Sequence, residues 1–204
     1  MTGTAPLVRF ENIQKSYDGQ TLVVKNLNLE VGKGEFVTML GPSGSGKTTC
    51  LMMLAGFEPP TQGTIYLQSK SINTVPPYKR GIGMVFQNYA LFPHMTVAEN
   101  LAFPLEVRKM GKTEREERVK WALDMVQLGD FGNRRPAQLS GGQQQRVAVA
   151  RAVIAKPSLI LADEPTGNLD SSHGEEVMNL LDSLNQNGTT IVMVTHSQRD
   201  AEYS

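Results

Sequence analysis

Short apolar segments and polar turns alternate along the first part of the chain, a pattern typical of β-strands. The segments are rich in Val, Leu, Ile and Phe, and glycine-containing turns such as Asp18-Gly19 separate the early ones. A glycine-rich loop and a helix that ends near Gly56 interrupt the series after its third member. The predicted strands cover residues 7–10, 22–31, 36–40, 63–68 and 82–86.

From Thr96 to about Gln127 the apolar positions recur with the period of a helix, as Val119, Leu123 and Val126 illustrate. Within this region, Thr113 and Glu116 have the spacing of a capping box, which satisfies backbone N–H groups at a helix start. Pro104 has no backbone N–H, so we expect it to kink a helix or to start one.

Strands and helices alternate in the last third of the chain. A helix over residues 143–155 precedes an apolar strand at 159–162. A second helix, with Ser172 and Glu175 as its predicted capping box, precedes a β-branched strand at 189–194.

This alternation predicts an α/β fold, with a mostly parallel sheet and helices on its faces. We expect a single domain over residues 1–204. Residues 1–90 and 146–204 would form an N-terminal antiparallel β region and the core, and residues 91–145 an inserted helical subdomain.

Composition narrows the function classes. The formal net charge of the 204 residues is zero and no basic stripe is visible, which disfavours a nucleic-acid surface. The single cysteine, Cys50, cannot form a disulfide within the chain and suits a reducing compartment. No apolar run is long enough to cross a bilayer, so we expect a soluble, cytoplasmic protein.

The glycine-rich loop matches the phosphate-binding loop (P-loop) of nucleoside triphosphatases, and it has the required strand before it and helix after it. Its glycines let backbone amides surround the β- and γ-phosphates, the lysine contacts the same oxygens, and the threonine hydroxyl holds Mg²⁺. A chance glycine-rich turn is the alternative. The residues expected to bind nucleotide here are Gly41, Pro42, Ser43, Gly44, Ser45, Gly46, Lys47, Thr48 and Thr49.

Two acidic residues end the apolar strand at 159–162 and predict the metal and catalytic groups. Asp163 lies where the carboxyl end of the strand meets the ligand-binding edge of such sheets, and we expect it to hold Mg²⁺. Glu164 follows and is expected to orient or deprotonate the attacking water. Both acids could instead cap the next helix.

A second anion-binding turn lies far downstream, in the sequence Leu139-Ser140-Gly141-Gly142-Gln143. It opens a helix, so exposed backbone N–H groups and the helix dipole both favour an anion there. One chain therefore carries two predicted phosphate-binding surfaces.

Taken in order, these motifs resemble those of ATP-binding cassette (ABC) ATPases, and the resemblance covers nearly the whole chain. It implies a switch histidine at His196 that contacts the γ-phosphate. It also implies a Q-loop glutamine at Gln87 that reaches Mg²⁺ and water, and an adenine-stacking aromatic at Tyr17. Asn168-Leu169-Asp170 resembles the D-loop of these proteins. Taken singly, His196, Gln87 and Tyr17 could each be ordinary structural residues.

The resemblance implies an ATPase that works as a head-to-tail pair. ATP and Mg²⁺ bound to the P-loop of one copy would be completed by Ser140, Gly141, Gly142 and Gln143 of the other. The γ-phosphate would join the copies, and hydrolysis driven by Glu164 would release them. Integral membrane permease subunits would be partners, with this chain peripheral on the inner face of the membrane and residues 87–94 receiving a permease helix.

The two ends of the chain resemble different ABC groups. Residues 78–94, within the first 145, look like the ATPases of sugar and polyamine importers. Residues 162–170, near the last segment of 159–204, look like the lipoprotein-release and macrolide-export group. One hypothesis is a chimera, natural or engineered, with a junction between Arg146 and Ser158, and ordinary drift within one family is the alternative. Solute import is favoured over export.

ABC domains normally continue past the switch histidine, whereas this chain stops at Ser204. From this we expect a shortened C-terminal end without a regulatory domain, and a weakened sheet edge. A second function hypothesis follows: a truncated or engineered module that binds ATP without coupling to transport. A third is a cytosolic ABC ATPase that acts outside transport.

Overall fold

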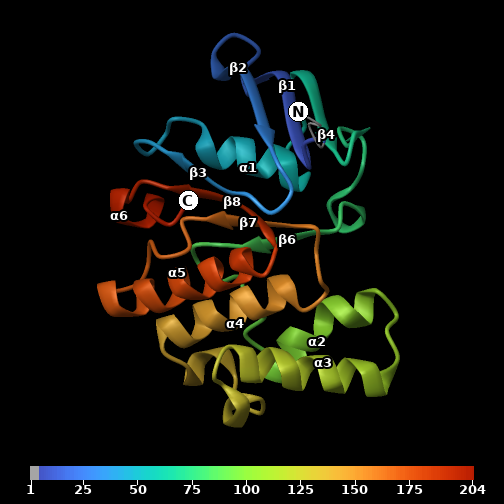
Figure 1. Ribbon diagram of the computed structural model, residues 1–204, viewed down its shortest axis with the longest axis vertical. Helices are drawn as coiled ribbons and strands as arrows, with labels where there is room; N and C mark the ends of the chain where they lie inside the picture. Colours follow the sequence, from blue (N-terminus) through green and yellow to red (C-terminus); the bar gives the residue numbers. More distant parts are fainter. Residues whose placement is uncertain (1–4) are drawn as a thin grey trace.

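The computed structural model describes residues 5–204 and contains two sheets (Figure 1). The first sheet is antiparallel, with strand order β2-β1-β4-β5. Strands β1 and β2 are joined by the turn predicted at Asp18-Gly19, where Asp18 accepts hydrogen bonds from the backbone of Gln20 and Thr21. The bounds of these strands are β1 Val8–Ser16, β2 Leu22–Val31, β4 Gln62–Leu67 and β5 Lys70–Ser71.

The second sheet is parallel, with strand order β3-β8-β7-β6. Every residue of β8 is buried, as are the first four of β7, because helices or the other sheet cover both faces. Such strands read as continuous apolar runs rather than as alternating ones. Their bounds are β3 Phe36–Leu40, β6 Ile82–Val85, β7 Leu159–Asp163 and β8 Thr190–Thr195.

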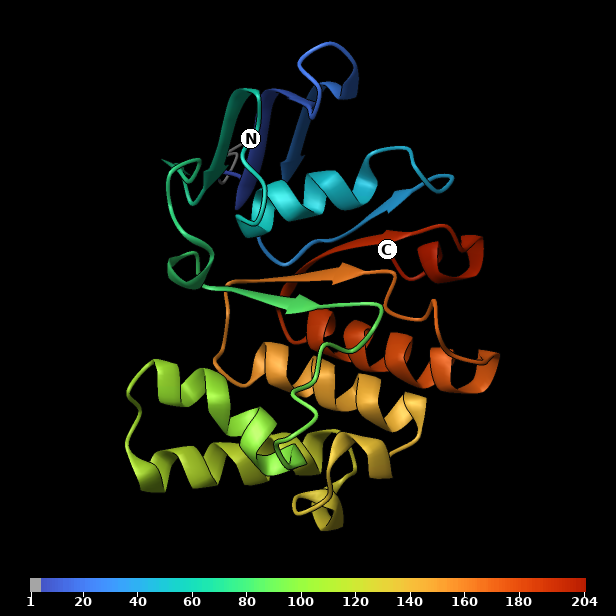
Figure 2. The ribbon, with the colours of Figure 1, turned by 180° about the vertical axis from the view of Figure 1, so that it is seen from behind.

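Alternate side chains of the central strands enter two different cores. Leu161 and Val192 pack in the cluster that contains α1 (Lys47–Ala55) and the antiparallel sheet. Ile160 and Ile191 pack in the cluster that contains α4 (Gly141–Val153) and α5 (Ser171–Gln186). Helix α1 therefore lies on one face of the parallel sheet, and α4 and α5 lie on the other (Figure 2).

The helical region lies beyond α4, at the end of the molecule opposite the antiparallel sheet (Figure 1). Its apolar cluster includes Val147 and Ala150 of α4 and Ile154, the C-cap of that helix, so α4 contributes side chains to two cores. The subdomain boundaries at residues 91 and 145 stay a prediction. The elements are α2 Val97–Val107, α3 Lys112–Met125, and the 3₁₀ helices η2 Gly129–Phe131 and η3 Pro136–Gln138.

The predicted α/β fold is confirmed. Pro104 lies inside α2 and does not start a helix, and the kink expected there stays a prediction. Two local predictions are wrong. Thr113 does not cap a helix, because α3 begins one residue earlier and has Gly111 as its N-cap, with no side-chain cap. Ser172 lies within α5, whose N-cap is Asp170: this carboxylate accepts from two backbone N–H groups and takes the place expected for the hydroxyl.

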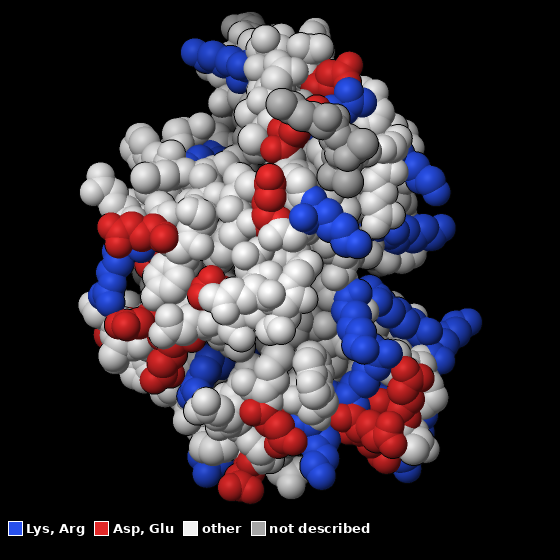
Figure 3. Space-filling model, viewed as in Figure 1, with Lys and Arg blue, Asp and Glu red and all other residues white. Residues whose placement is uncertain are grey.

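No helix in the described residues 5–204 is long and apolar enough to cross a membrane. On the face seen in Figure 3, basic side chains gather along the right-hand edge at mid-height, and basic and acidic side chains lie adjacent over the helical region below. The presence of both signs on this face agrees with the zero net charge of the chain.

Arg80 is a buried cation that ties the end of α1 to the loop before β6. Its guanidinium donates to the carbonyl oxygens of Met53 and Leu54, at 2.9 Å each, and of Val75, at 2.8 Å. Burial lowers its pKa from the ordinary value. The two helix carbonyls are among the last of α1, where no intrahelical donor is available to them.

Replacing Arg80 with Met is therefore expected to destabilise the fold, because three carbonyl groups, two of them buried, would lose this donor. We expect a loss of about 2–4 kcal/mol in the free energy of unfolding, measured by urea denaturation. The matched control is Arg9→Met, since Arg9 pairs with Glu11 at an exposed site and should cost about 0–1 kcal/mol. Equal losses in the two variants would contradict the role given to Arg80.

Candidate functional site

The P-loop joins β3 to α1, and its conformation depends on glycine. Gly44 and Gly46 have φ of +81° and +86°, values that L residues with side chains rarely adopt. A Cβ at Gly46 would also lie 2.8 Å from the carbonyl oxygen of Val23 in β2. Gly46 is the N-cap of α1, so the loop presents the start of a helix at the edge of the parallel sheet.

The Lys47 ammonium is folded back onto its own loop. It donates to the carbonyl oxygens of Gly41 and Pro42 at 2.7 Å each, and to the hydroxyl of Ser45 at 3.1 Å. These contacts use the three hydrogens that an ammonium group carries. The cation is thus placed inside the loop, beside the backbone that forms the predicted phosphate cradle.

Thr48 and Asp163 meet although 115 residues separate them in the chain. The Thr48 hydroxyl donates to the Asp163 carboxylate at 2.9 Å, which joins the start of α1 to the end of β7. Burial raises the pKa of Asp163, and the neighbouring Glu164 raises it further, while Thr48 and Lys47 act in the opposite direction. Two oxygen groups of the type that Mg²⁺ prefers therefore lie together.

Glu164 and His196 form the second pair. The Glu164 carboxylate lies 3.1 Å from Nδ1 of His196, with side-chain exposures of 19% and 54%. Glu164 has a φ of +44°, which is unusual for a residue with a side chain, and its backbone N–H donates to Val194 at 2.9 Å. The backbone after β7 is therefore held in a sparsely populated conformation at the residue predicted to act on water.

Gln87 lies against the predicted D-loop. Nδ2 of Asn168 donates to the Gln87 carbonyl at 3.0 Å, and the Gln87 side chain donates to Asn168 at 3.4 Å. A Cβ at Gly167 would lie 2.6 Å from the Gln87 amide, so this approach depends on glycine. The structure brings the segment after β6 and the segment after β7 together.

The turn at Ser140 lies beside the predicted D-loop, because a Cβ at Gly141 would be 3.5 Å from the Leu169 side chain and 2.8 Å from the Tyr89 hydroxyl. Ser140 is the exposed N-cap of α4, and it forms a reciprocal capping box with Gln143, with hydrogen bonds of 2.9 and 3.2 Å. Helix α4 packs on the face of the parallel sheet opposite α1, so the two predicted anion-binding turns lie in different layers. Gly142 lies against the ring of His173, where a Cβ would approach within 2.5 Å.

Tyr17 is 61% exposed, at the end of the antiparallel sheet. Its ring contacts the Lys15 ammonium, 4.8 Å from the ring centroid. A hollow of about 850 Å³ lies beside the P-loop, lined among the described residues by β2, Met39, the loop and Cys50, and not by Tyr17. Burial raises the pKa of the Cys50 thiol to about 11, which keeps it protonated at neutral pH.

Gln145 is a site residue that the sequence analysis missed. It is fully buried in α4, and its side-chain amide donates to the carbonyl oxygens of Phe86, at 3.2 Å, and Pro165, at 2.6 Å. It therefore links α4 to the residues just before Gln87 and just after Glu164. A polar residue on the buried face of a predicted helix was the available signal, because a buried amide must find partners.

Comparison with known proteins connects these motifs to a family. The family model described as ABC transporter matches residues 24–167, more than half of the chain. The chain is 47% identical over 196 residues to the spermidine/putrescine import ATP-binding protein PotA of Bacillus cereus, and 50% identical over 196 residues to that of Acetivibrio thermocellus. Each match covers 96% of this chain but only 60% and 55% of the relative, respectively, so the chain spans little more than half of their length.

The fold agrees with solved structures of the same kind. The dimeric structure of a post-hydrolysis state of the ATP-binding cassette MJ0796 bound to ADP and Pi has a TM-score of 0.86 with this chain, at 41% identity. The match covers 97% of this chain and 91% of that one. The dimeric structure of MJ0796 described as a bacterial ABC transporter cassette matches equally well.

The chimera hypothesis receives no support from these matches. Each alignment covers at least 96% of the chain and so runs through the proposed junction between Arg146 and Ser158. Separate comparison of residues 1–145 and 159–204 stays the test of that hypothesis.

The structure pairs the predicted motif residues at the edge of its parallel sheet. Thr48 meets Asp163, Glu164 meets His196, and Gln87 meets Asn168. This chain belongs to the ABC transporter family, as an ATP-binding domain.

Proposed function

We propose that the chain binds and hydrolyses ATP as a head-to-tail pair, and that hydrolysis powers import through separate membrane subunits. The observation that carries the proposal is the separation of the two anion-binding turns. The P-loop precedes α1 and the Ser140 turn begins α4, on opposite faces of one sheet. A second copy can supply the turn that this layered arrangement keeps away from the P-loop of the same chain.

The P-loop and its neighbours would hold the triphosphate. Lys47 would exchange its contacts with the loop for phosphate oxygens, and the loop amides would donate to the same oxygens. Thr48 and Asp163 present a hydroxyl and a carboxylate, 2.9 Å apart, which suit Mg²⁺. When bound, Mg²⁺ neutralises charge that develops on the phosphates during transfer.

Three polar side chains would act on the attacking water. Glu164 would accept its proton or orient it, and His196, which already contacts this carboxylate, would fix the carboxylate position and reach toward the γ-phosphate. Gln87 would stand by Mg²⁺ and the water, held by its contact with Asn168. Tyr17 would stack on adenine only after its exposed ring moves beside the bound base.

The second copy would complete the site with the start of α4. The residues of this turn are Ser140, Gly141, Gly142 and Gln143. The capping box uses the N–H groups of Ser140 and Gln143, so the donors at this helix N-terminus are those of Gly141 and Gly142. Because the turn needs the γ-phosphate as its ligand, the pair would form with ATP and separate after hydrolysis.

A membrane subunit would bind near Gln87. An apolar hollow of about 330 Å³ lies between β6, α2 and α4, and its lining includes Phe86, Phe92 and Phe103. An amphipathic helix presents the kind of apolar face that such a groove accepts. Relatives named for spermidine/putrescine import favour import, with this chain on the inner side of the membrane.

The competing function is an ATP-binding module that couples to nothing. It shares the P-loop, so ATP binding does not separate the two. The decisive experiment measures ATPase rate per chain against protein concentration, together with mass by light scattering in ATP. We expect the rate to rise with concentration and a dimer to form. A monomer whose rate per chain is constant would refute the pair mechanism.

The raised pKa of Asp163 predicts how Mg²⁺ dependence changes with pH. A carboxyl whose pKa is raised takes up its proton at a higher pH than usual, and protonation removes the anionic ligand. We therefore expect the extra ATP affinity that Mg²⁺ confers to fall on acidification before an ordinary aspartate would titrate. Titrating ATP with and without Mg²⁺ at decreasing pH measures this. An unchanged Mg²⁺ contribution down to the ordinary aspartate pKa would contradict it.

A further inference from the structure

The segment after His196 is tied down by a buried carboxylate. Helix α6 (Gln198–Ala201) begins directly after Ser197, its N-cap, whose hydroxyl accepts from the backbone N–H of Asp200 at 3.2 Å. Asp200 is only 8% exposed, although it lies in a four-residue surface helix. A buried carboxylate needs a donor, which makes its partner informative.

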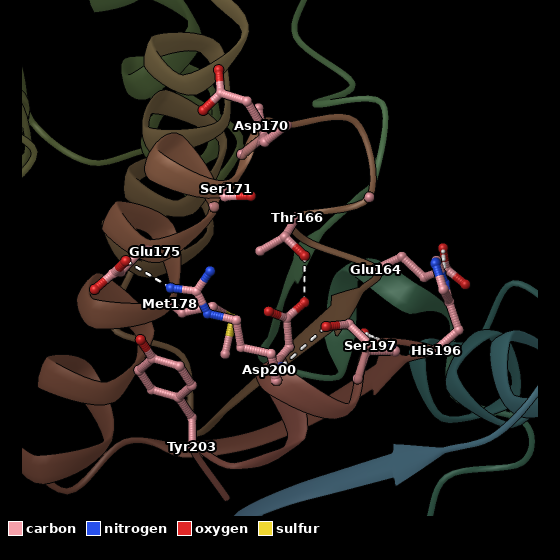
Figure 4. Close-up of a pocket in the computed structure, with 15 residues that line it drawn as sticks. Glu164, Thr166, Asp170, Ser171, Glu175, Met178, His196, Ser197, Asp200 and Tyr203 are labelled. Atoms are coloured by element: carbon pink, nitrogen blue, oxygen red, sulfur yellow. Dashed lines mark hydrogen bonds and ion pairs between the residues drawn. The ribbon is translucent and has the colours of Figure 1, made fainter.

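That partner is Thr166, in the turn that follows Glu164. The Thr166 hydroxyl donates to the Asp200 carboxylate at 2.5 Å (Figure 4). The turn itself is closed by two backbone hydrogen bonds, from Gly167 to Glu164 at 3.0 Å and from Leu169 to Thr166 at 2.9 Å. Asp200 therefore connects the segment that follows His196 to the turn that follows Glu164.

We propose that the Thr166–Asp200 hydrogen bond is a positioning device that holds Glu164 and His196 in register. The proposal rests on the catalytic roles given to those two residues above. Two short chain segments, 164–166 and 196–200, carry the residues concerned. The Thr166–Asp200 hydrogen bond joins the segments at one end, and the contact of 3.1 Å between His196 and Glu164 joins them at the other. Neither member of the bond needs to touch nucleotide or water.

The backbone of Glu164 shows why such a restraint matters. Its φ of +44° is costly for a residue with a side chain, and strained backbone persists only where its surroundings fix it. The hydrogen bond from its N–H to Val194 fixes one side. On the other side lies a hollow of about 270 Å³, bordered by Thr166, His196 and Asp200, which packing leaves open. The Thr166–Asp200 hydrogen bond joins two residues at the border of this hollow.

Other contacts of this C-terminal segment are weaker candidates. Arg199 pairs with Glu175 at 2.8 Å, but both side chains are more than half exposed. Tyr203 donates to Asn179 at 3.2 Å, also at the surface. Exposed pairs contribute little, whereas a buried hydrogen bond to a charged group is among the stronger ones. The pair with Glu175 thus provides a control on the same helix.

The experiment uses matched variants of the whole chain. Thr166→Val removes the hydroxyl and keeps the shape, and Asp200→Ala removes the acceptor. Thr166→Ser and Asp200→Asn keep a donor and an acceptor. Arg199→Ala is the control. Two readouts are compared: steady-state ATPase kinetics, and hydrogen exchange at the Gly167 and Leu169 amides, which reports on the turn without any catalysis.

We expect Thr166→Val and Asp200→Ala each to lower kcat about fivefold to tenfold, with KM for ATP changed less than about twofold. The double variant should lose no more than either single one, and exchange at the two amides should rise about tenfold. Thr166→Ser, Asp200→Asn and Arg199→Ala should stay close to wild type in both readouts.

Unchanged exchange in Asp200→Ala would overturn the proposal whatever the ATPase result. Faster exchange with unchanged kcat would also overturn it, because the turn would then be mobile without consequence for catalysis. Additive losses in the double variant would overturn the direct coupling. If wild type failed to hydrolyse ATP, the proposed function would fail, and the positioning role in hydrolysis that rests on it would fall with it.

Discussion

Lys47→Ala is expected to abolish ATP binding. The ammonium is the cation that the P-loop encloses, and the neutral variant would remove the positive charge that this loop directs at the phosphates. We expect the affinity for ATP to fall by at least about 100-fold, or about 3 kcal/mol, which corresponds to losing charge-assisted hydrogen bonds in a partly enclosed site. Titration of ATP by calorimetry measures the loss.

The control for this variant is Lys33→Ala, which removes an exposed lysine of the turn before β3 and should leave ATP affinity unchanged. Because Lys47 also donates to Gly41, Pro42 and Ser45, its removal could loosen the loop. The melting temperature without nucleotide separates the two effects: it should shift by only a few degrees, on the order of 1 kcal/mol. Binding retained at wild-type strength would refute the role of Lys47.

The layered fold follows from the apolar pattern. Strands β2 and β3 begin and end where the pattern predicted, because turns with glycine bound them on both sides. The parallel strands β7 and β8 were also recognisable, since continuous apolar runs mark strands that are buried on both faces.

Helix starts were less predictable, because several polar residues compete to cap one helix. At α5, Asp170 precedes Ser171 and Ser172, and each of the three can accept from backbone N–H groups. The Asp170 carboxylate caps the helix by accepting from the backbone N–H groups of Ser172 and His173. Its hydrogen bonds with the backbone and side chain of His173, and then with the Ser172 hydroxyl, hold its pKa well below the ordinary value. Spacing alone does not rank these competitors.

Some residues of the candidate site could be predicted from the sequence and others could not. The P-loop, Asp163 and Glu164 were predictable, since each depends on a strand, a turn or a helix start that the local sequence indicates. Gln145 and Asp200 act through tertiary contacts, with carbonyl oxygens 20 and 59 residues away and with a hydroxyl 34 residues away. No local pattern encodes such pairings, so the folded structure was required to find them.

Glu164→Gln is expected to stop hydrolysis while keeping the ATP-bound pair. Glutamine preserves the shape and can still hydrogen-bond to His196, but it cannot accept the proton of the attacking water. We expect kcat to fall by about 10³-fold with ATP affinity kept within about threefold. Because the γ-phosphate then persists, the dimer should accumulate in ATP and be visible by size-exclusion chromatography with light scattering.

The trapped pair also tests whether the second copy completes the site. Adding Ser140→Arg to Glu164→Gln would place a bulky side chain at the start of α4 without touching the P-loop, since α4 packs on the opposite face of the sheet from α1. We expect ATP to bind the double variant normally while the dimer disappears. Glu175→Gln, at an exposed acid of α5, is the control and should neither trap the pair nor slow hydrolysis. Fast turnover by Glu164→Gln would refute its catalytic role, and a dimer that survives Ser140→Arg would show that the copies meet through another surface.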